Sequence, residues 1–361
     1  MTQRTLDADK DAPSADAPVA RATPAARAGD RAIGAWLLAC AACVLAMVLV
    51  GGVTRLTRSG LSITQWEPVT GVLPPMGEAA WSDAFAQYKA TPEFQAVNAS
   101  MTLEGFKSIY LVEWGHRLLG RFAGLLFGVP LVWFVARRRL RGVKLVRLLA
   151  VFGLGGLQGA VGWWMVKSGL VDVPRVSPYR LATHLLFAVA LLGLLVWYGL
   201  GELEPATAPD ARAATLPRRL GAALIAAIAV TLTWGALMAG LHAGHVAPTF
   251  PTMNGAWIPP GMGGYERDLF ENPITVHFAH RTLAYATALL AAAVVALAWR
   301  TRDALTRRRA VALAVLVGAQ LTLGALTVLR HVRIDLASAH QVNAVLVLAA
   351  AVALVHRLRA R

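Results

Sequence analysis

The sequence predicts an all-α, polytopic membrane protein with eight transmembrane helices. Of its 361 residues, 57% are hydrophobic and only 15% are charged, a composition that excludes a water-soluble enzyme. A helix needs about 20 apolar residues to cross a bilayer, so each apolar stretch of that length marks a span. Eight such stretches occur, at residues 33–52, 118–136, 145–166, 181–200, 220–240, 278–299, 310–329 and 337–356.

The first 52 residues are predicted to form a tail and the first span. Residues 1–31 are rich in Ala, Asp, Pro and Arg and lack apolar periodicity, so we expect a disordered cytoplasmic tail. Its mixed charge argues against a cleaved targeting segment. The two cysteines, Cys40 and Cys43, lie inside the first span, which excludes an outer-loop disulfide and favours buried small residues over a redox pair.

Basic residues predict an N-in, C-in orientation. In a soluble protein the net charge of +15 would favour nucleic acid as a partner, but in a membrane protein basic loops mark the inner side, and we expect no nucleic acid here. The long loop 241–277 contains a single arginine, Arg267. The loop between the second and third spans is instead strongly basic, with Arg137, Arg138, Arg139, Arg141, Lys144 and Arg147.

Two outer loops, 53–110 and 241–277, are too long to be simple connections. In the first loop Trp81, Phe85 and Tyr88 recur at helical spacing. We therefore expect short amphipathic helices that lie over the bundle mouths and limit access of water.

The two halves of the chain repeat one pattern. Gly51, Ser59-Gly60 and Pro74-Pro75 in the first half correspond to Gly235, Ala243-Gly244 and Pro259-Pro260 in the second, and Gln158 and Gly162 correspond to Gln320 and Gly324. This repeat predicts two four-helix bundles, 32–200 and 220–361, joined by a cytoplasmic linker 201–219. An even number of spans returns the chain to its starting side, so the units are parallel, unlike inverted-repeat transporters.

Four histidines occupy matched positions at the outward ends of spans. His116 and His184 in the first unit correspond to His280 and His340 in the second. Ionisable residues inside spans are costly and usually functional. Two histidines at one depth on different helices can hold a haem iron from both axial sides. Zinc is a weaker candidate, because no H-E-x-x-H motif occurs and carboxylates are scarce.

The two units differ at one acidic position. Glu113 precedes His116 by one helical turn, whereas His277 stands in the corresponding place before His280. The carboxylate indicates chemistry in the first unit and electron transfer in the second. The competing interpretation is an ion pair of Glu113 with Arg117 on an exposed helix end.

Other charged residues near these histidines have candidate roles. Arg117 and Arg281 follow the histidines directly and, with Arg121, are candidate partners for haem propionates, although interfacial anchoring also explains them. In the second outer loop, a small metal cluster of His242, His245 and His277 is a further hypothesis. His356, among the terminal arginines, is expected at the membrane interface.

Together these residues resemble the haem A synthases of aerobic bacteria and mitochondria, over nearly everything after the tail. The motifs are Gly51 to Thr57, Ser59-Gly60-Leu61-Ser62, Trp66 to Pro75, Glu113-Trp114-Gly115-His116-Arg117, Gln158 to Leu170, Thr249-Phe250-Pro251, Trp257-Ile258-Pro259, His280-Arg281 and Ala339-His340-Gln341.

The resemblance implies oxidation of a ring methyl of haem O to a formyl group, by successive hydroxylations, to give haem A for cytochrome oxidase. It assigns haem b to His280 and His340, the substrate haem to His116 and His184, and catalysis to Glu113. It also implies a haem O synthase and oxidase assembly factors as partners, an electron-transfer partner that the sequence does not identify, and the bacterial inner membrane, or the mitochondrial one, as location. The outer-loop cysteine pair of some bacterial members is absent here.

Two other functions compete with this interpretation. A di-haem membrane cytochrome b that only carries electrons would need no Glu113. A carrier that moves haem across the bilayer would need sites on both faces, whereas all four matched histidines lie towards one face.

Overall fold

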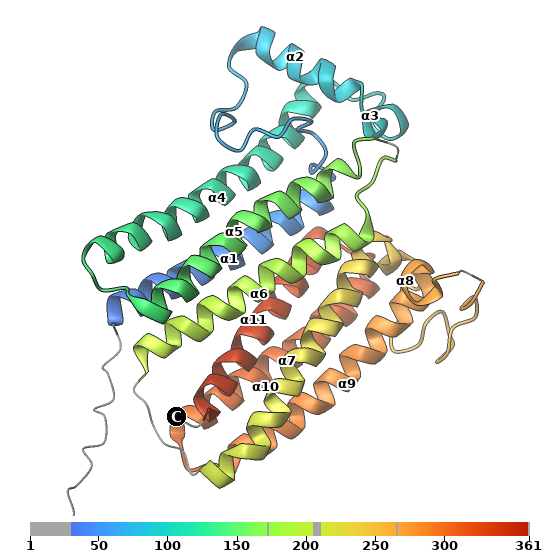
Figure 1. Cartoon of the computed structure of the whole chain (residues 1–361). Coiled ribbons are helices and arrows are strands. Elements are labelled where there is room, and N and C mark those ends of the chain that lie inside the picture. Colours follow the sequence, from blue (N-terminus) through green and yellow to red (C-terminus); the bar gives the residue numbers. More distant parts are fainter. Residues whose placement is uncertain (1–29, 172, 205–210, 265, 360–361) are drawn as a thin grey trace, which may run out of the picture.

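The computed structural model describes residues 30–171, 173–204, 211–264 and 266–359 (Figure 1). Within these ranges regular structure is helical apart from a single bridge between Met253 and Ala256. Eight helices are long and apolar enough to span a membrane, which confirms the predicted fold class. They are α1 (Arg31–Leu56), α4 (Leu103–Ala136), α5 (Gly142–Lys167), α6 (Pro178–Leu203), α7 (Ala211–Gly240), α9 (Pro273–Trp299), α10 (Ala304–Leu329) and α11 (Ile334–Leu358).

The spanning helices group into two rings of four neighbours. Helix α1 contacts α4 and α6, and α5 contacts the same two helices, which closes the first ring. Helices α7, α9, α10 and α11 close a second ring in the same way. The rings join where α1 and α6 pack on α7 and α11 (Figure 1). The symmetry between the rings and their orientation in the membrane stay predictions.

Several helix ends differ from the predicted boundaries because polar caps, and not only apolar length, determine where a helix begins. The Asp30 side chain accepts hydrogen bonds from the N–H groups of Ala32 and Ile33, so α1 begins at Arg31, inside the predicted tail; residues 1–29 lie outside the described ranges. Thr102 caps α4 through the N–H of Gly105, which extends this helix well into the predicted loop 53–110.

The predicted linker 201–219 is too long. Helix α6 continues to Leu203 and α7 begins at Ala211. Apolar length marks where a helix can span a bilayer, but it does not prevent a helix from continuing beyond the bilayer.

The first outer loop forms a helical cap, as its spacing predicts. Helices α2 (Gly77–Lys89) and α3 (Pro92–Ala96) contact each other, and α2 packs on α4. Tyr88 and Phe106 are both 0% exposed and stack with their ring centroids 5.2 Å apart. The second outer loop differs, because its helices η1 (Ala243–His245) and α8 (Asp268–Glu271) are too short to present an amphipathic face.

Two further expectations concern isolated side chains. Cys40 and Cys43 are buried, unbonded thiols in α1, as predicted. His356, near the end of α11, is 2% exposed, packs edge-on against Trp197 and lies 3.5 Å from a carboxylate oxygen of Glu204, and its position at the membrane interface stays a prediction. The arginines that follow His356 in the sequence gave no indication that its side chain packs between helices.

Candidate functional site

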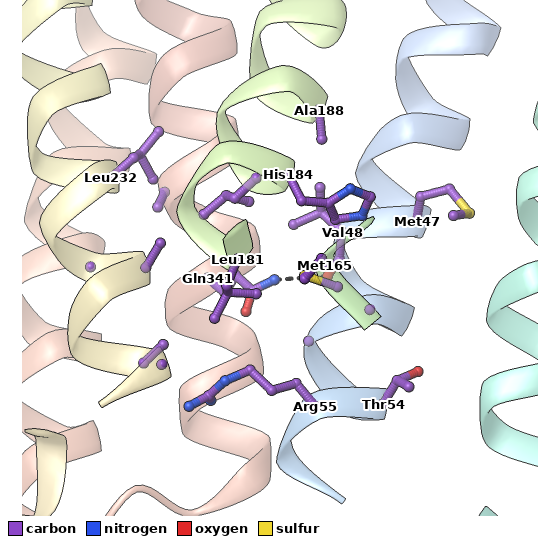
Figure 2. Close-up of a pocket in the computed structure, with 18 of the residues that line it drawn as sticks. Met47, Val48, Thr54, Arg55, Met165, Leu181, His184, Ala188, Leu232 and Gln341 are labelled. Carbon is purple, nitrogen blue, oxygen red and sulfur yellow. Dashed lines mark hydrogen bonds between the residues drawn. The ribbon is translucent and has the colours of Figure 1, made fainter. Parts of the chain in front are cut away.

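A cavity of about 1500 Å³ extends through both rings of helices. All eight spanning helices contribute to its wall, and all four repeat-matched histidines line it. Figure 2 shows part of this wall, where His184 on α6 lies near Met47 and Val48 on α1. Both units therefore present their histidine pairs to one internal space.

Each matched histidine lies against a glycine of a neighbouring helix. A Cβ atom placed on Gly51, Gly162 or Gly324 would come within 2.9 Å of Cε1 of His116, His184 or His340, respectively. For Gly235 and His280 the corresponding distance is 3.1 Å. These separations are shorter than a normal carbon–carbon contact, so a side chain at any of these glycines would push the imidazole away from the neighbouring helix.

The imidazoles also have polar neighbours that orient them. Nδ1 of His280 lies 3.2 Å from the carbonyl oxygen of Thr231, the arrangement that leaves Nε2 available to a metal. The Gln320 amide nitrogen lies 3.2 Å from Nδ1 and 3.3 Å from Nε2 of His340, and Asn343 donates a 2.8 Å hydrogen bond to the Gln320 amide oxygen. The amide of Gln158 donates to the backbone carbonyl of His184.

The donor set fits haem. Within the cavity, His116 on α4 and His184 on α6 belong to the first ring of helices, and His280 on α9 and His340 on α11 belong to the second. Nδ1 of His116 and Nδ1 of His184 are buried without a hydrogen-bond partner. Buried polar atoms in a native fold normally have hydrogen-bond partners. These two imidazoles therefore have a ring nitrogen that no described residue pairs with, which is compatible with a bound ligand. Paired imidazoles beside a large cavity suit a planar tetrapyrrole.

Glu113 is 3% exposed and faces the first-unit part of the cavity. Its Oε2 accepts hydrogen bonds from the Ser62 hydroxyl at 2.7 Å and from the Ile63 N–H at 2.8 Å. Its Oε1 forms a 2.7 Å ion pair with Arg117. The ion pair that the competing interpretation expected is therefore present, but it is buried in the site and does not lie on an exposed helix end.

His277 takes the place of Glu113 in the second unit with the same helix geometry. It is 0% exposed, and its Nε2 accepts a 3.0 Å hydrogen bond from Nε of Arg281. The second unit therefore keeps the arginine contact but has no carboxylate at this position.

The arginines after the histidines hold the outer loops. Arg117 donates to the carbonyls of Ile63 and Gln65 at 2.9 and 2.7 Å. Arg281 donates to the carbonyls of Ala247 and Thr249 at 3.1 and 2.8 Å. Arg121 likewise donates to the carbonyls of Glu67 and Pro68. Most donors of these three arginines are thus engaged within the chain, while the side chains still line the cavity.

A family model described as cytochrome oxidase assembly protein matches residues 34–352. This chain belongs to that family. A protein named heme A synthase from Parvibaculum lavamentivorans is 46% identical over 334 residues, covering 92% of this chain and 95% of the relative. Proteins of the same name from Rhodopseudomonas palustris (46%) and Azorhizobium caulinodans (45%) cover 91% and 93% of this chain and 91% and 95% of their own lengths.

The metal cluster predicted for the second outer loop does not form. Across the ranges that the structure describes, no three His, Cys, Asp or Glu side chains are grouped to hold a metal ion. Nε2 of His277 accepts a hydrogen bond from Arg281, and His242 and His245 line the same cavity without forming such a group. Although the three histidines belong to one stretch of the sequence, their side chains are not arranged around a common metal position.

Sequence reasoning missed two kinds of residue in this member of the assembly-protein family. The repeat matched these glycines and glutamines between the two halves of the chain. Nothing in the sequence indicated that they contact the matched histidines. The second kind is Glu93 in α3, which belongs to no motif or repeat match in the sequence. It is 5% exposed, lines the cavity and accepts a 3.2 Å hydrogen bond from Tyr88. Burial raises the pKa of Glu93 to about 7.

Proposed function

We propose that this chain is a haem A synthase, an oxidoreductase that converts the ring methyl of haem O into the formyl group of haem A for cytochrome oxidase. The observation that carries the proposal is a glycine-backed histidine pair in each unit, with a buried carboxylate beside one pair alone. The unit 32–200 takes the substrate haem, and the unit 220–361 holds a haem b cofactor.

In the second unit, His280 and His340 are the residues that would hold haem b. When bound there, haem b supplies reversible one-electron chemistry at its iron. The carbonyl of Thr231 and the amide of Gln320 orient the two imidazoles. Arg281 fixes the outer loop that borders this site.

In the first unit, His116 and His184 are proposed to flank the substrate and Glu113 to be the catalytic carboxylate. Two successive two-electron hydroxylations, each adding a hydroxyl group from water and releasing two protons and two electrons to the external electron-transfer partner, would convert the methyl to a geminal diol, which loses water to leave the formyl group. Ser62, Ile63 and Arg117 hold both oxygens of Glu113 in a defined orientation. In a site shielded from water, a carboxylate in this place stabilises developing positive charge or takes up released protons.

The proposed location is the inner membrane of a bacterium, with the mitochondrial inner membrane as the alternative. The spanning helices support a multi-pass membrane protein, and the relatives named above are bacterial. A haem O synthase is the proposed source of substrate and oxidase assembly factors the proposed recipients. The partner that exchanges electrons with the second unit is not identified.

Extraction and mass spectrometry of the bound haems test the function. In cells that also make haem O, we expect the purified protein to hold haem b together with haem O, a hydroxylated intermediate or haem A. Glu113→Ala should keep the haem b absorption but stop formyl formation, whereas His340→Ala should remove that absorption. Haem b alone in the wild type, with no formyl product in the cells, would identify an electron carrier instead.

A further inference from the structure

Three arginines gather at the outward end of the cavity, near the junction of the two units. Arg55 and Arg58 lie at the end of α1, and Arg175 lies just before α6; all three line the cavity. Figure 2 shows Arg55 extending from α1 towards the second unit. Partial burial lowers the pKa of His242, which belongs to the second unit. The positive charges of Arg55, Arg58 and Arg175, together with His245, lower this pKa further, so the three arginines all lie near His242.

The cavity contains more positive than negative charge. Six arginines line it, against three acids, Glu67, Glu93 and Glu113. The other three arginines, Arg117, Arg121 and Arg281, donate to carbonyls or to Glu113.

The cluster of Arg55, Arg58 and Arg175 differs from these anchored arginines. In the described part of the chain, no acceptor lies within hydrogen-bond distance of its guanidinium groups. Glu113 is already held by Ser62, Ile63 and Arg117. Grouped guanidinium groups repel one another, so this arrangement favours an anionic ligand with more than one acceptor group.

The position of the cluster connects it with the first histidine pair. Arg55 lies one helical turn beyond Gly51, the residue that packs on His116. Arg175 precedes the helix that carries His184. In the second unit the repeat places Ala239 where the first has Arg55, so this arginine has no counterpart in the second unit.

We propose, on the basis of the function proposed above, that Arg55, Arg58 and Arg175 bind the two propionate carboxylates of the tetrapyrrole held between His116 and His184. A planar guanidinium matches a carboxylate through paired hydrogen bonds. Contacts at the outward edge fix the rotation of the ring about the axis through its iron, and so determine which ring substituent faces Glu113. The cluster is therefore a positioning site for the substrate.

Equilibrium binding with two probes tests this inference. The protein is purified with haem b in place from cells that lack haem O, in uncharged detergent, and is titrated with haemin or with haemin dimethyl ester, which lacks free carboxylates. We expect Arg55→Gln and Arg175→Gln each to weaken haemin binding about tenfold or more and to leave binding of the ester unchanged. Arg330→Gln is the matched control, because Arg330 is exposed at the end of α10 and does not line the cavity.

Three results would overturn the proposal. The wild type could bind the ester as tightly as the acid, or the variants could lose both probes equally, which would indicate a structural role. Alternatively, the variants could lose bound phosphatidylglycerol, measured by lipid mass spectrometry, with unchanged affinity for haemin, which would assign the cluster to a lipid headgroup. Formation of haem A by the wild type is measured separately, so failure of the proposed function is distinguishable from failure of this inference.

Discussion

Four glycines determine how closely the histidines approach the helices behind them. In each unit the imidazole occupies the space that a Cβ atom would take on Gly51, Gly162, Gly235 or Gly324. Glycine usually destabilises a helix interior by about 0.5–1 kcal/mol relative to alanine. Four such positions, each opposite a histidine, indicate that closeness to the ring outweighs this cost.

Gly324→Ala tests this arrangement. The added methyl group would lie 2.9 Å from Cε1 of His340, so the ring must turn away from its position in the cavity. We expect loss or a marked shift of the haem b absorption in the purified variant. Gly318→Ala on the same helix is the control, because its Cβ meets no atom within 4 Å. Equal spectra for the two variants would show that His340 does not depend on the glycine.

Glu93 makes the stability of the cap depend on pH. Burial raises its pKa from 4.5 to about 7 in the folded protein. Its contribution to stability is therefore fully present below about pH 4.5 and is lost as the pH rises through about 7, a change of up to about 3 kcal/mol. Tyr88 donates to this carboxyl, Glu113 raises its pKa further, and Arg58 opposes the shift.

Hydrogen–deuterium exchange, corrected for the intrinsic effect of pH, measures this dependence. In the wild type we expect residues 77–98 to exchange faster at pH 8 than at pH 5, whereas Glu93→Gln should exchange alike at both. Glu78→Gln, an exposed acid of α2, should behave as the wild type. Persistence of the pH dependence in Glu93→Gln would assign it to another group.

Among the structural elements, the outer loops depend on arginines that rise from the helices beneath them. Arg117 in α4 and Arg281 in α9 each donate to several loop carbonyls of their own unit. The presence of both arginines was evident in the sequence, but their partners were not. Every residue has the same backbone carbonyl group, so no sequence pattern shows which loop carbonyls accept these hydrogen bonds.

Arg281→Gln should release the second outer loop. The variant loses donors to Ala247, Thr249 and Thr252, so we expect faster deuterium exchange in residues 246–254. Arg267→Gln is the control, since Arg267 is exposed and its guanidinium lies 3.9 Å from Glu271, outside residues 246–254. Unchanged exchange in the Arg281 variant would mean that packing alone holds the loop.

At the scale of the whole molecule, a polar contact ties the two units together beside their sites. Gln341 follows the haem b ligand candidate His340 and donates a 2.8 Å hydrogen bond to the carbonyl of Val48 in α1 (Figure 2). A Cβ on Gly52 would lie 2.8 Å from the Gln341 side chain. The wall behind His116 and the wall that carries His340 are therefore in direct contact.

Gln341→Leu should weaken the junction between the units. Loss of one interhelical hydrogen bond costs about 1 kcal/mol, and we expect a lower thermal midpoint for the purified protein. Thr322→Val is the control, because the Thr322 hydroxyl bonds only within α10, to the carbonyl of Gly318. A midpoint equal to that of the control would show that apolar packing of α1 and α6 on α7 and α11 is sufficient.

The sequence by itself determined the eight spans, because a bilayer requires about 20 apolar residues whatever surrounds them. It also determined the candidate histidines and Glu113, because a repeat makes each half a reference for the other. Only the tertiary structure decided that glycines lie behind the imidazoles, that Glu113 is held by loop donors and that Glu93 is buried. It also decided that three arginines converge where the described residues offer their guanidinium groups no hydrogen-bond acceptor. These features join residues from different helices and loops, and which residues meet depends on how the helices pack.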